Sequence, residues 1–118
     1  SHRDLKPENI FVSEKGYLKI GDLGSAGISE KARKKLNIKN YKHKDGEKEE
    51  DKLDTFVGTT EYVSPEIIKG YSCSCAADMW SLGVIIYQLY TGLTPFNEPD
   101  SQYFTFQNIM ECKYEIPE

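Results

Sequence analysis

The chain has 118 residues, 29% of them charged, and a formal net charge of −4. This length suits one small domain, and the acidic balance gives no basic footprint, so no nucleic-acid partner is expected. The most apolar run, Met79 to Tyr90, is shorter than the roughly 20 residues of a membrane span, so no span is expected either. The odd set of three cysteines favours reduced thiols in the cytoplasm, with the nucleus as the alternative.

A polar loop and a β-hairpin are predicted at the start of the chain. Residues 10–20 alternate apolar and polar side chains on both sides of the turn sequence SEKG, which predicts two antiparallel strands. Gly16 can take a positive φ in such a turn. A hairpin brings its two ends together, so Asn9, before the first strand, and Asp22, after the second, are expected to lie close in space.

Residues 25–54 are rich in charge and poor in apolar side chains. Lys31 to Lys44 contains basic but no acidic residues, whereas Asp45 to Asp54 is mainly acidic. Such a stretch cannot bury enough surface to offset the entropy cost of ordering, so a mobile loop is predicted. The basic run is interpreted as solvated charge, with docking, nuclear import and phosphate contact as alternatives.

The sequence SPEIIKG at 64–70 predicts a short helix. Ser64 would be the N-cap, proline is favoured at the first helical position, and the following glutamate suits the first turn. Gly70 would end this helix.

Two further helices are predicted in the last third of the chain. The longer one spans 75–91, with Ser74 as its cap and Gly92 as its stop. Its apolar residues surround the axis, which predicts a fully buried helix that needs neighbours on all sides. A second helix is predicted near 102–112.

Four side chains near the start are of the types that phosphoryl transfer requires. Asn9 and Asp22 offer an amide oxygen and a carboxylate, the hard ligands that suit Mg²⁺. Asp4 is expected at the same end of the hairpin, with Lys6 between it and Asn9. A carboxylate for a hydroxyl proton, a lysine for a phosphate and two Mg²⁺ ligands predict a phosphoryl-transfer site. The alternative is that Asp4 and Asp22 are ordinary turn or cap residues.

The chain resembles the protein kinases along nearly its whole length. HRDLKPEN resembles their catalytic loop, DLG their metal-binding triplet, FVGTTEYVSPE the end of their activation segment, and ADMWSLGVIIYQLYTGLTPF their central helix. The motifs occur in the family's order, and only residues 30–54 fall outside the resemblance. FVGTTEYVSPE and FTFQNI…YEIPE look most similar to the phosphoinositide-dependent protein kinases of the AGC group.

The resemblance implies an α+β fold, namely part of the mainly helical carboxy-terminal lobe of a kinase domain, with a small catalytic-loop hairpin and the amino-terminal lobe absent. Residues 1–24 would hold the catalytic loop, hairpin and DLG triplet. Residues 25–66 would form the activation segment with its charged insert at 30–54, and residues 67–118 the central buried helix and the following helix. The chain alone is therefore expected to be inactive, since nucleotide binding needs both lobes.

The resemblance also implies roles for individual residues. Asp4 would be the catalytic base, and Lys6 would steady the γ-phosphate of ATP. Asn9 and Asp22 would bind Mg²⁺. Phe11 matches the position that forms the floor of the adenine pocket.

Further residues would support or regulate this site. Thr59 would bond Asp4 and Lys6 and orient both. Thr55 matches the site of the activating phosphate, added by an upstream kinase or by autophosphorylation, and Arg3 would receive that phosphate; a plain loop threonine is the alternative.

Three residues are expected to act as structural support. His2 is interpreted as a buried structural histidine, with a catalytic one as the alternative. Asp78 would cap backbone amides of the catalytic loop from the central helix. Glu66 would pair with an arginine that this chain does not contain.

The resemblance implies a serine/threonine protein kinase that transfers the γ-phosphate of Mg²⁺-bound ATP to Ser or Thr hydroxyls of protein substrates. The alternative function is a catalytically idle, kinase-like scaffold that binds partners. The charged insert at 30–54 and two departures from the family's pattern motivate this alternative. Leu23 replaces the commoner phenylalanine of the triplet, and Gly21 before Asp22 is small and flexible.

Overall fold

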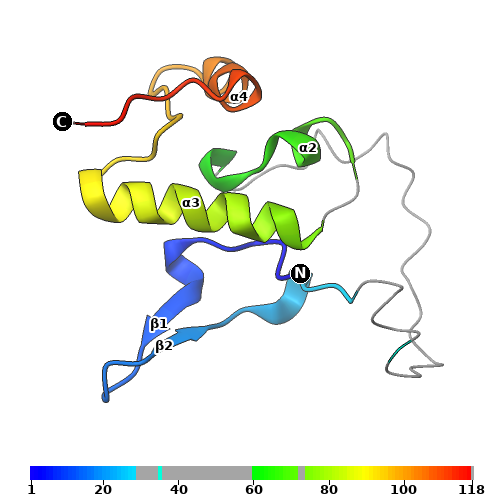
Figure 1. The fold of residues 1–118 in the computed structure, drawn as a ribbon, viewed down its shortest axis with the longest axis vertical. Helices are drawn as coiled ribbons and strands as arrows, with labels where there is room; N and C mark the ends of the chain where they lie inside the picture. The colour runs from blue at the N-terminus through cyan, green and yellow to red at the C-terminus, as the bar shows by residue number, and fades with distance from the viewer. Residues whose placement is uncertain (29–34, 36–59, 72–73, 118) are drawn as a thin grey trace.

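A computed structural model describes residues 1–28, 35, 60–71 and 74–117 of the chain (Figure 1). Its described part contains three α-helices and a two-stranded antiparallel sheet, together with three short 3₁₀ helices. This composition agrees with the predicted α+β class. The predictions for Thr55, for Thr59 and for most of the charged loop lie outside the described residues.

The predicted hairpin is confirmed. Strand β1 (Ile10–Val12) pairs antiparallel with β2 (Leu18–Ile20), and Ile10 lies opposite Ile20. Gly16 has a φ of 80° in the connecting turn, the left-handed conformation that favours glycine. Beyond the strands, the N–H of Gly21 donates to the carbonyl of Asn9 at 2.8 Å. The hairpin therefore joins Asn9 to the residue directly before Asp22.

The short helix α2 spans Pro65–Ile68 and follows the 3₁₀ helix η4 (Thr60–Tyr62). Ser64 occupies the N-cap position as predicted, but its side chain makes no capping hydrogen bond. Its hydroxyl is instead buried, with no partner in the described part of the chain. Gly70, with a φ of 78°, ends this segment as expected.

Helix α3 (Cys75–Thr91) has the predicted bounds and runs through the middle of the molecule (Figure 1). The Ser74 hydroxyl accepts from the N–H of Ala76, and Gly92 ends the helix with a φ of 83°. Within the described part, no helix is long and apolar enough to cross a membrane.

The prediction that this helix is fully buried is wrong for the described part of the chain. One side is buried, but Leu89 is 81% exposed, and three further large side chains lie in solvent: Met79, Ile86 and Tyr90. An apolar helix needs neighbours all round its axis, and the described elements contact only part of that circumference.

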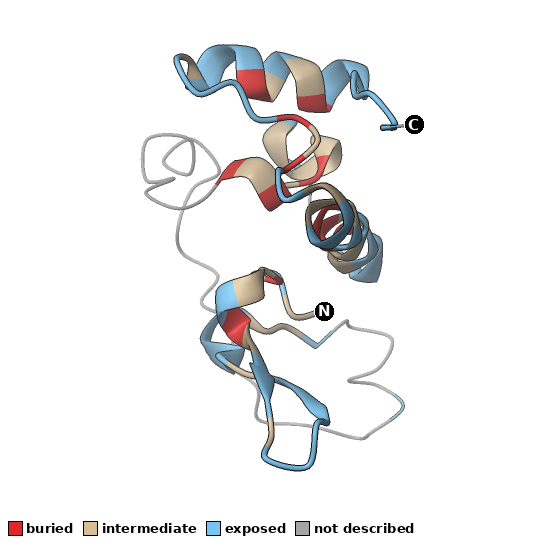
Figure 2. Ribbon diagram, turned by 90° about the vertical axis from the view of Figure 1, so that its left-hand side faces the viewer, coloured by how far each residue is buried: buried red, intermediate tan, exposed pale blue. Residues whose placement is uncertain are grey.

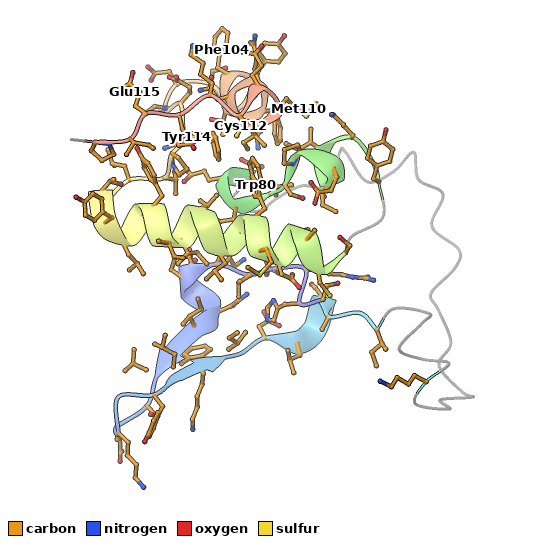
Figure 3. All side chains as sticks on the ribbon, in the orientation of Figure 1. Trp80, Phe104, Met110, Cys112, Tyr114 and Glu115 are labelled. Carbon is orange, nitrogen blue, oxygen red and sulfur yellow. The ribbon has the colours of Figure 1, made fainter. Side chains whose placement is uncertain are left out.

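Helix α4 spans Gln102–Glu111, and its N-cap Ser101 accepts from the N–H of Phe104. Its buried face packs toward α2 and α3, where the core residues gather (Figure 2). Trp80 extends from α3 toward this region (Figure 3) and stacks on Phe96 with a ring separation of 5.4 Å. The buried apolar cluster comprises Leu5, Tyr62, Val84, Ile85, Phe96 and Ile109.

Ile109 is 0% exposed and fixes α4 to this cluster. We expect Ile109→Ala in the full-length protein to lower the free energy of unfolding by about 2–5 kcal/mol, because it removes buried methyl groups and leaves a cavity. Guanidinium unfolding followed by circular dichroism measures this loss. Met110→Ala, at the neighbouring exposed position, is the control, and an equal loss in both variants would contradict the packing described.

Candidate active site

Asp4, Lys6 and Asn9 converge because the 3₁₀ helix η1 (Pro7–Asn9) turns the chain back on itself. The Asn9 amide nitrogen donates to the Asp4 carbonyl at 2.8 Å and to Asp4 Oδ2 at 3.2 Å. Lys6 Nζ lies 3.1 Å from the same Oδ2. Asn9 is buried, whereas the carboxylate of Asp4 is partly exposed. Two side chains thus hold one accessible carboxylate in place.

Asp22 directly follows Gly21, whose N–H donates to the Asn9 carbonyl. This bond brings the Asp22 segment next to the cluster of Asp4, Lys6 and Asn9. Its φ of 54° is left-handed, and its Oδ1 accepts from the N–H of Gly24 at 3.3 Å. Asp22 therefore caps the 3₁₀ helix η2 (Leu23–Ser25), as the alternative interpretation expected. This cap uses only one of the two carboxylate oxygens.

The residues present fit a Mg²⁺ ion. In the described part of the chain, Asn9 Oδ1 and Asp22 Oδ2 accept no hydrogen bond. Both are hard oxygen atoms, which Mg²⁺ prefers. No group of three or more His, Cys, Asp or Glu side chains that could hold a metal ion is found among the described residues, at this site or at any other. An ion held by two protein oxygens would complete its octahedral shell with water and phosphate oxygens.

His2 connects the loop of Asp4 to the segment of Asp22. The Asp4 N–H donates to His2 Nδ1 at 3.3 Å, and His2 Nε2 lies 2.8 Å from the Gly21 carbonyl. A ring whose Nδ1 accepts must carry its proton on Nε2, so the second contact is a donation to Gly21. Both ring nitrogens are thereby used in structural contacts.

Asp78 of α3 binds the backbone at the start of the loop that carries Asp4. Its two carboxylate oxygens accept from the N–H groups of His2 and Arg3, each at 2.8 Å. Arg3 has a φ of 73°, a left-handed conformation that costs a residue with a Cβ about 1–3 kcal/mol. Hydrogen bonds to a carboxylate are stronger than neutral ones and can offset this strain. Helix α3 thus anchors the start of the loop.

Comparisons with known proteins identify the family of this chain. The sequence-family model for the protein kinase domain matches residues 1–117. The chain belongs to the protein kinase family. It is 38% identical over 117 residues to human 3-phosphoinositide-dependent protein kinase 1, covering 99% of this chain and 18% of that protein.

Two fungal kinases give similar values. The serine/threonine-protein kinase ksg1 of Schizosaccharomyces pombe is 40% identical over 120 residues, which cover 98% of this chain and 19% of that kinase. PKH2 of Candida albicans is 40% identical over 117 residues, which cover 96% and 11%. The resemblance to phosphoinositide-dependent kinases is confirmed. The kinase chain spans less than a fifth of the length of these three relatives.

Some predicted site residues of this chain are not brought into the cluster of Asp4, Lys6 and Asn9. Phe11 lies on β1 and is 55% exposed. Glu66 is half-buried in α2 and has no ion pair in the described part of the chain. Arg3 is exposed, and its guanidinium packs closely against the backbone of Gly27.

Sequence reasoning missed a second polar network in the kinase chain, between η4 and α3. The Tyr62 hydroxyl donates to Gln88 Oε1 at 2.8 Å, and Ser81 Oγ donates to the Tyr62 carbonyl. Nearby, the Thr94 hydroxyl donates to Glu61 Oε2 at 2.5 Å. These pairs are 19 to 33 residues apart in sequence, and no motif spacing indicates them. The network ties the segment that follows Thr59 to the core.

Burial raises the pKa of the Tyr62 phenol above its ordinary value of 10.0, with the Glu8 carboxylate as the second cause, while the bond to Gln88 acts in the opposite direction. The unfolded chain therefore loses this proton at a lower pH than the folded one. Stability from the neutral phenol is complete below pH 10 and is lost as pH rises through the folded pKa.

We expect unfolding free energy to fall more steeply above pH 10 in the wild type than in Tyr62→Phe. At neutral pH the variant should lose about 1 kcal/mol with its hydrogen bond. Urea unfolding at pH 8 and at several values above 10 measures both effects. Tyr17→Phe, on the exposed hairpin, is the control, and parallel alkaline slopes for wild type and Tyr62→Phe would contradict the assignment.

Proposed function

We propose that this chain is the catalytic part of a serine/threonine protein kinase that transfers the γ-phosphate of ATP to a Ser or Thr hydroxyl of a protein. The observation that carries the proposal is the Asp4 carboxylate, held by Asn9 at 3.2 Å and by Lys6 at 3.1 Å, beside the Asp22 segment. A buried amide and a lysine thus meet one partly exposed carboxylate, and the chain segment that carries a second carboxylate, Asp22, is hydrogen-bonded to Asn9 through Gly21.

Asp4 would accept a hydrogen bond from the acceptor hydroxyl and take its proton as the phosphoryl group transfers. The bonds from Asn9 and Lys6 keep this carboxylate oriented before the substrate arrives, and such positioning is the larger part of catalysis in phosphoryl transfer. The Lys6 ammonium lies 3.1 Å from Asp4 Oδ2. It would therefore also contact an oxygen of the phosphoryl group that is transferred to a hydroxyl bound at Asp4.

Asn9 Oδ1 and Asp22 Oδ2 would hold Mg²⁺. When bound, the ion neutralises phosphate charge and stabilises the developing negative charge of the transition state. The hydrogen bond from Gly21 to Asn9 keeps the two ligands on the same end of the hairpin. Phe11 would lie under the base of the nucleotide.

Regulation would act through the start of the loop. We propose that phosphate on Thr55 pairs with the guanidinium of Arg3, a residue that is exposed at the surface. Thr59 would orient Asp4 and Lys6. Phosphorylation would come from an upstream kinase or from the protein itself.

The chain would form part of the carboxy-terminal lobe and would be inactive without the remainder of a kinase domain. The exposed apolar side of α3 supports this placement, because such a surface needs a cover. Cys75 and Cys112 are free and exposed, which suits a reducing compartment, and we propose the cytoplasm or the nucleus.

The acceptor specificity is tested by incubating the full-length protein with Mg²⁺, labelled ATP and an equimolar mixture of serine, threonine and tyrosine peptides. We expect label on serine and threonine in phosphoamino-acid analysis. Label on tyrosine alone would contradict the serine/threonine assignment. Absence of label on every peptide, with a folded protein phosphorylated at Thr55, would favour a scaffold.

A further inference from the structure

Gly21 contacts residues from three places in the chain: His2, Asn9 and Phe11. Its N–H donates to the Asn9 carbonyl, and its own carbonyl accepts from His2 Nε2. The Phe11 ring lies against its Cα: a Cβ added at Gly21 would lie 2.5 Å from Cε2 and 3.1 Å from Cδ2 of that ring. Real Cβ atoms essentially never make so short a contact, so a residue other than glycine at this position would require the Phe11 ring to shift.

The backbone does not require a glycine here. The residues of this chain with a left-handed φ in the described part do not include Gly21, so an alanine would fit its backbone conformation. Space for Phe11 is therefore the reason for this glycine. The register explains the contact, because Phe11 faces Lys19 and residue 21 is its diagonal neighbour, within reach of an aromatic side chain.

The Phe11 ring is more than half exposed although it is an apolar side chain. It lies two residues after Asn9, and it packs on the residue directly before Asp22. A planar aromatic face beside a site for phosphate and metal suits the planar base of a nucleotide, which stacks on aromatic rings.

We propose that Gly21 is a positioning residue for the nucleotide: its missing side chain lets the Phe11 ring rest on the backbone and so sets the platform for the base. The inference rests on the proposed kinase function and deepens it. Both backbone groups of Gly21 are hydrogen-bonded, whereas the Phe11 ring is exposed. A Cβ at residue 21 will therefore displace the ring and leave the backbone of Asp22 in place.

The test is a double-mutant cycle on the full-length protein, with kcat and the KM for ATP measured at saturating peptide. We expect Gly21→Ala to raise the KM for ATP about tenfold and to change kcat less than about twofold, since contacting residues couple by this amount. Phe11→Leu alone shrinks the platform without adding atoms and should raise KM about threefold. In the double variant Gly21→Ala/Phe11→Leu the clashing ring is gone, so KM should fall to within about twofold of Phe11→Leu.

Gly83→Ala is the matched control, because a Cβ at Gly83 meets nothing within 4 Å; it should leave both constants unchanged. An unchanged KM in Gly21→Ala or in Phe11→Leu would overturn the inference and leave the kinase function standing. A loss of kcat at constant KM, or a KM in the double variant as high as in Gly21→Ala, would also overturn it. A wild type that neither binds Mg²⁺-ATP nor transfers phosphate would overturn both.

Discussion

Asp4→Asn in the full-length protein is expected to lower kcat by about a hundred- to ten-thousand-fold, the usual contribution of a positioned general base. The amide cannot take the acceptor's proton, although it fills the same space. The KM for ATP should change little, because the Asn9 amide keeps its 2.8 Å bond to the backbone carbonyl of residue 4, and Asp22 makes no bond to Asp4 in the described part of the chain. Steady-state phosphate transfer at varied ATP measures both constants.

The control is Glu14→Gln, the same carboxylate-to-amide change in the exposed turn of the hairpin. It should leave kcat and KM unchanged. Thermal unfolding of both variants shows whether either has lost its fold. A folded Asp4→Asn variant that retains more than about a tenth of the wild-type kcat would contradict the role given to Asp4.

Asp78→Asn is expected to have the second large effect. The variant keeps one acceptor oxygen but turns an NH₂ donor toward the N–H of His2 or Arg3, so one of the two 2.8 Å bonds is lost and two donors oppose each other. We expect a loss of about 2–3 kcal/mol in unfolding free energy, because the lost bond is charge-assisted.

The same variant should reduce kcat about tenfold or more, because Asp78 anchors the loop that holds Asp4 and a small displacement of a catalytic group is costly. Asp100→Asn, in the exposed loop before α4, is the control. Urea unfolding and the transfer assay give the two readouts. Unfolding and kcat both equal to those of the control would show that α3 does not anchor the loop.

The elements of this fold were predictable where the signal is local. Gly16 and the alternation around it predict the hairpin, and Ser74 and Gly92 mark the ends of α3. Each signal is a φ angle or a capping hydrogen bond that involves residues only a few positions apart. A short stretch of sequence is therefore enough to predict it. Antiparallel pairing also predicts that the chain before Asp22 approaches Asn9, and Gly21 is hydrogen-bonded to Asn9.

Features that depend on distant segments were not predictable from residue patterns. Ser64 has the sequence signature of a cap, yet packing buries its hydroxyl without a partner in the described part of the chain. The bond from Tyr62 to Gln88 joins residues 26 positions apart. The space that Gly21 leaves for Phe11 requires the strand register and the ring position together.

The contact between Asp78 and the loop had a different source. His2 and Asp78 are 76 positions apart, and no spacing rule links them. The expectation came from the resemblance to protein kinases, and the structure places both amide donors on the carboxylate. Resemblance supplied this long-range information, which propensity and periodicity do not contain.

The most direct test of the central claim is phosphate transfer by the full-length protein from Mg²⁺ and γ-labelled ATP to a serine- and threonine-containing protein, beside an Asp22→Asn variant. We expect transfer by the wild type and its loss in the variant, because the variant removes a carboxylate ligand of the ion while both proteins keep the same thermal midpoint. Equal transfer by a folded Asp22→Asn protein, or none by a folded wild type phosphorylated at Thr55, would contradict the assignment of this site to phosphoryl transfer.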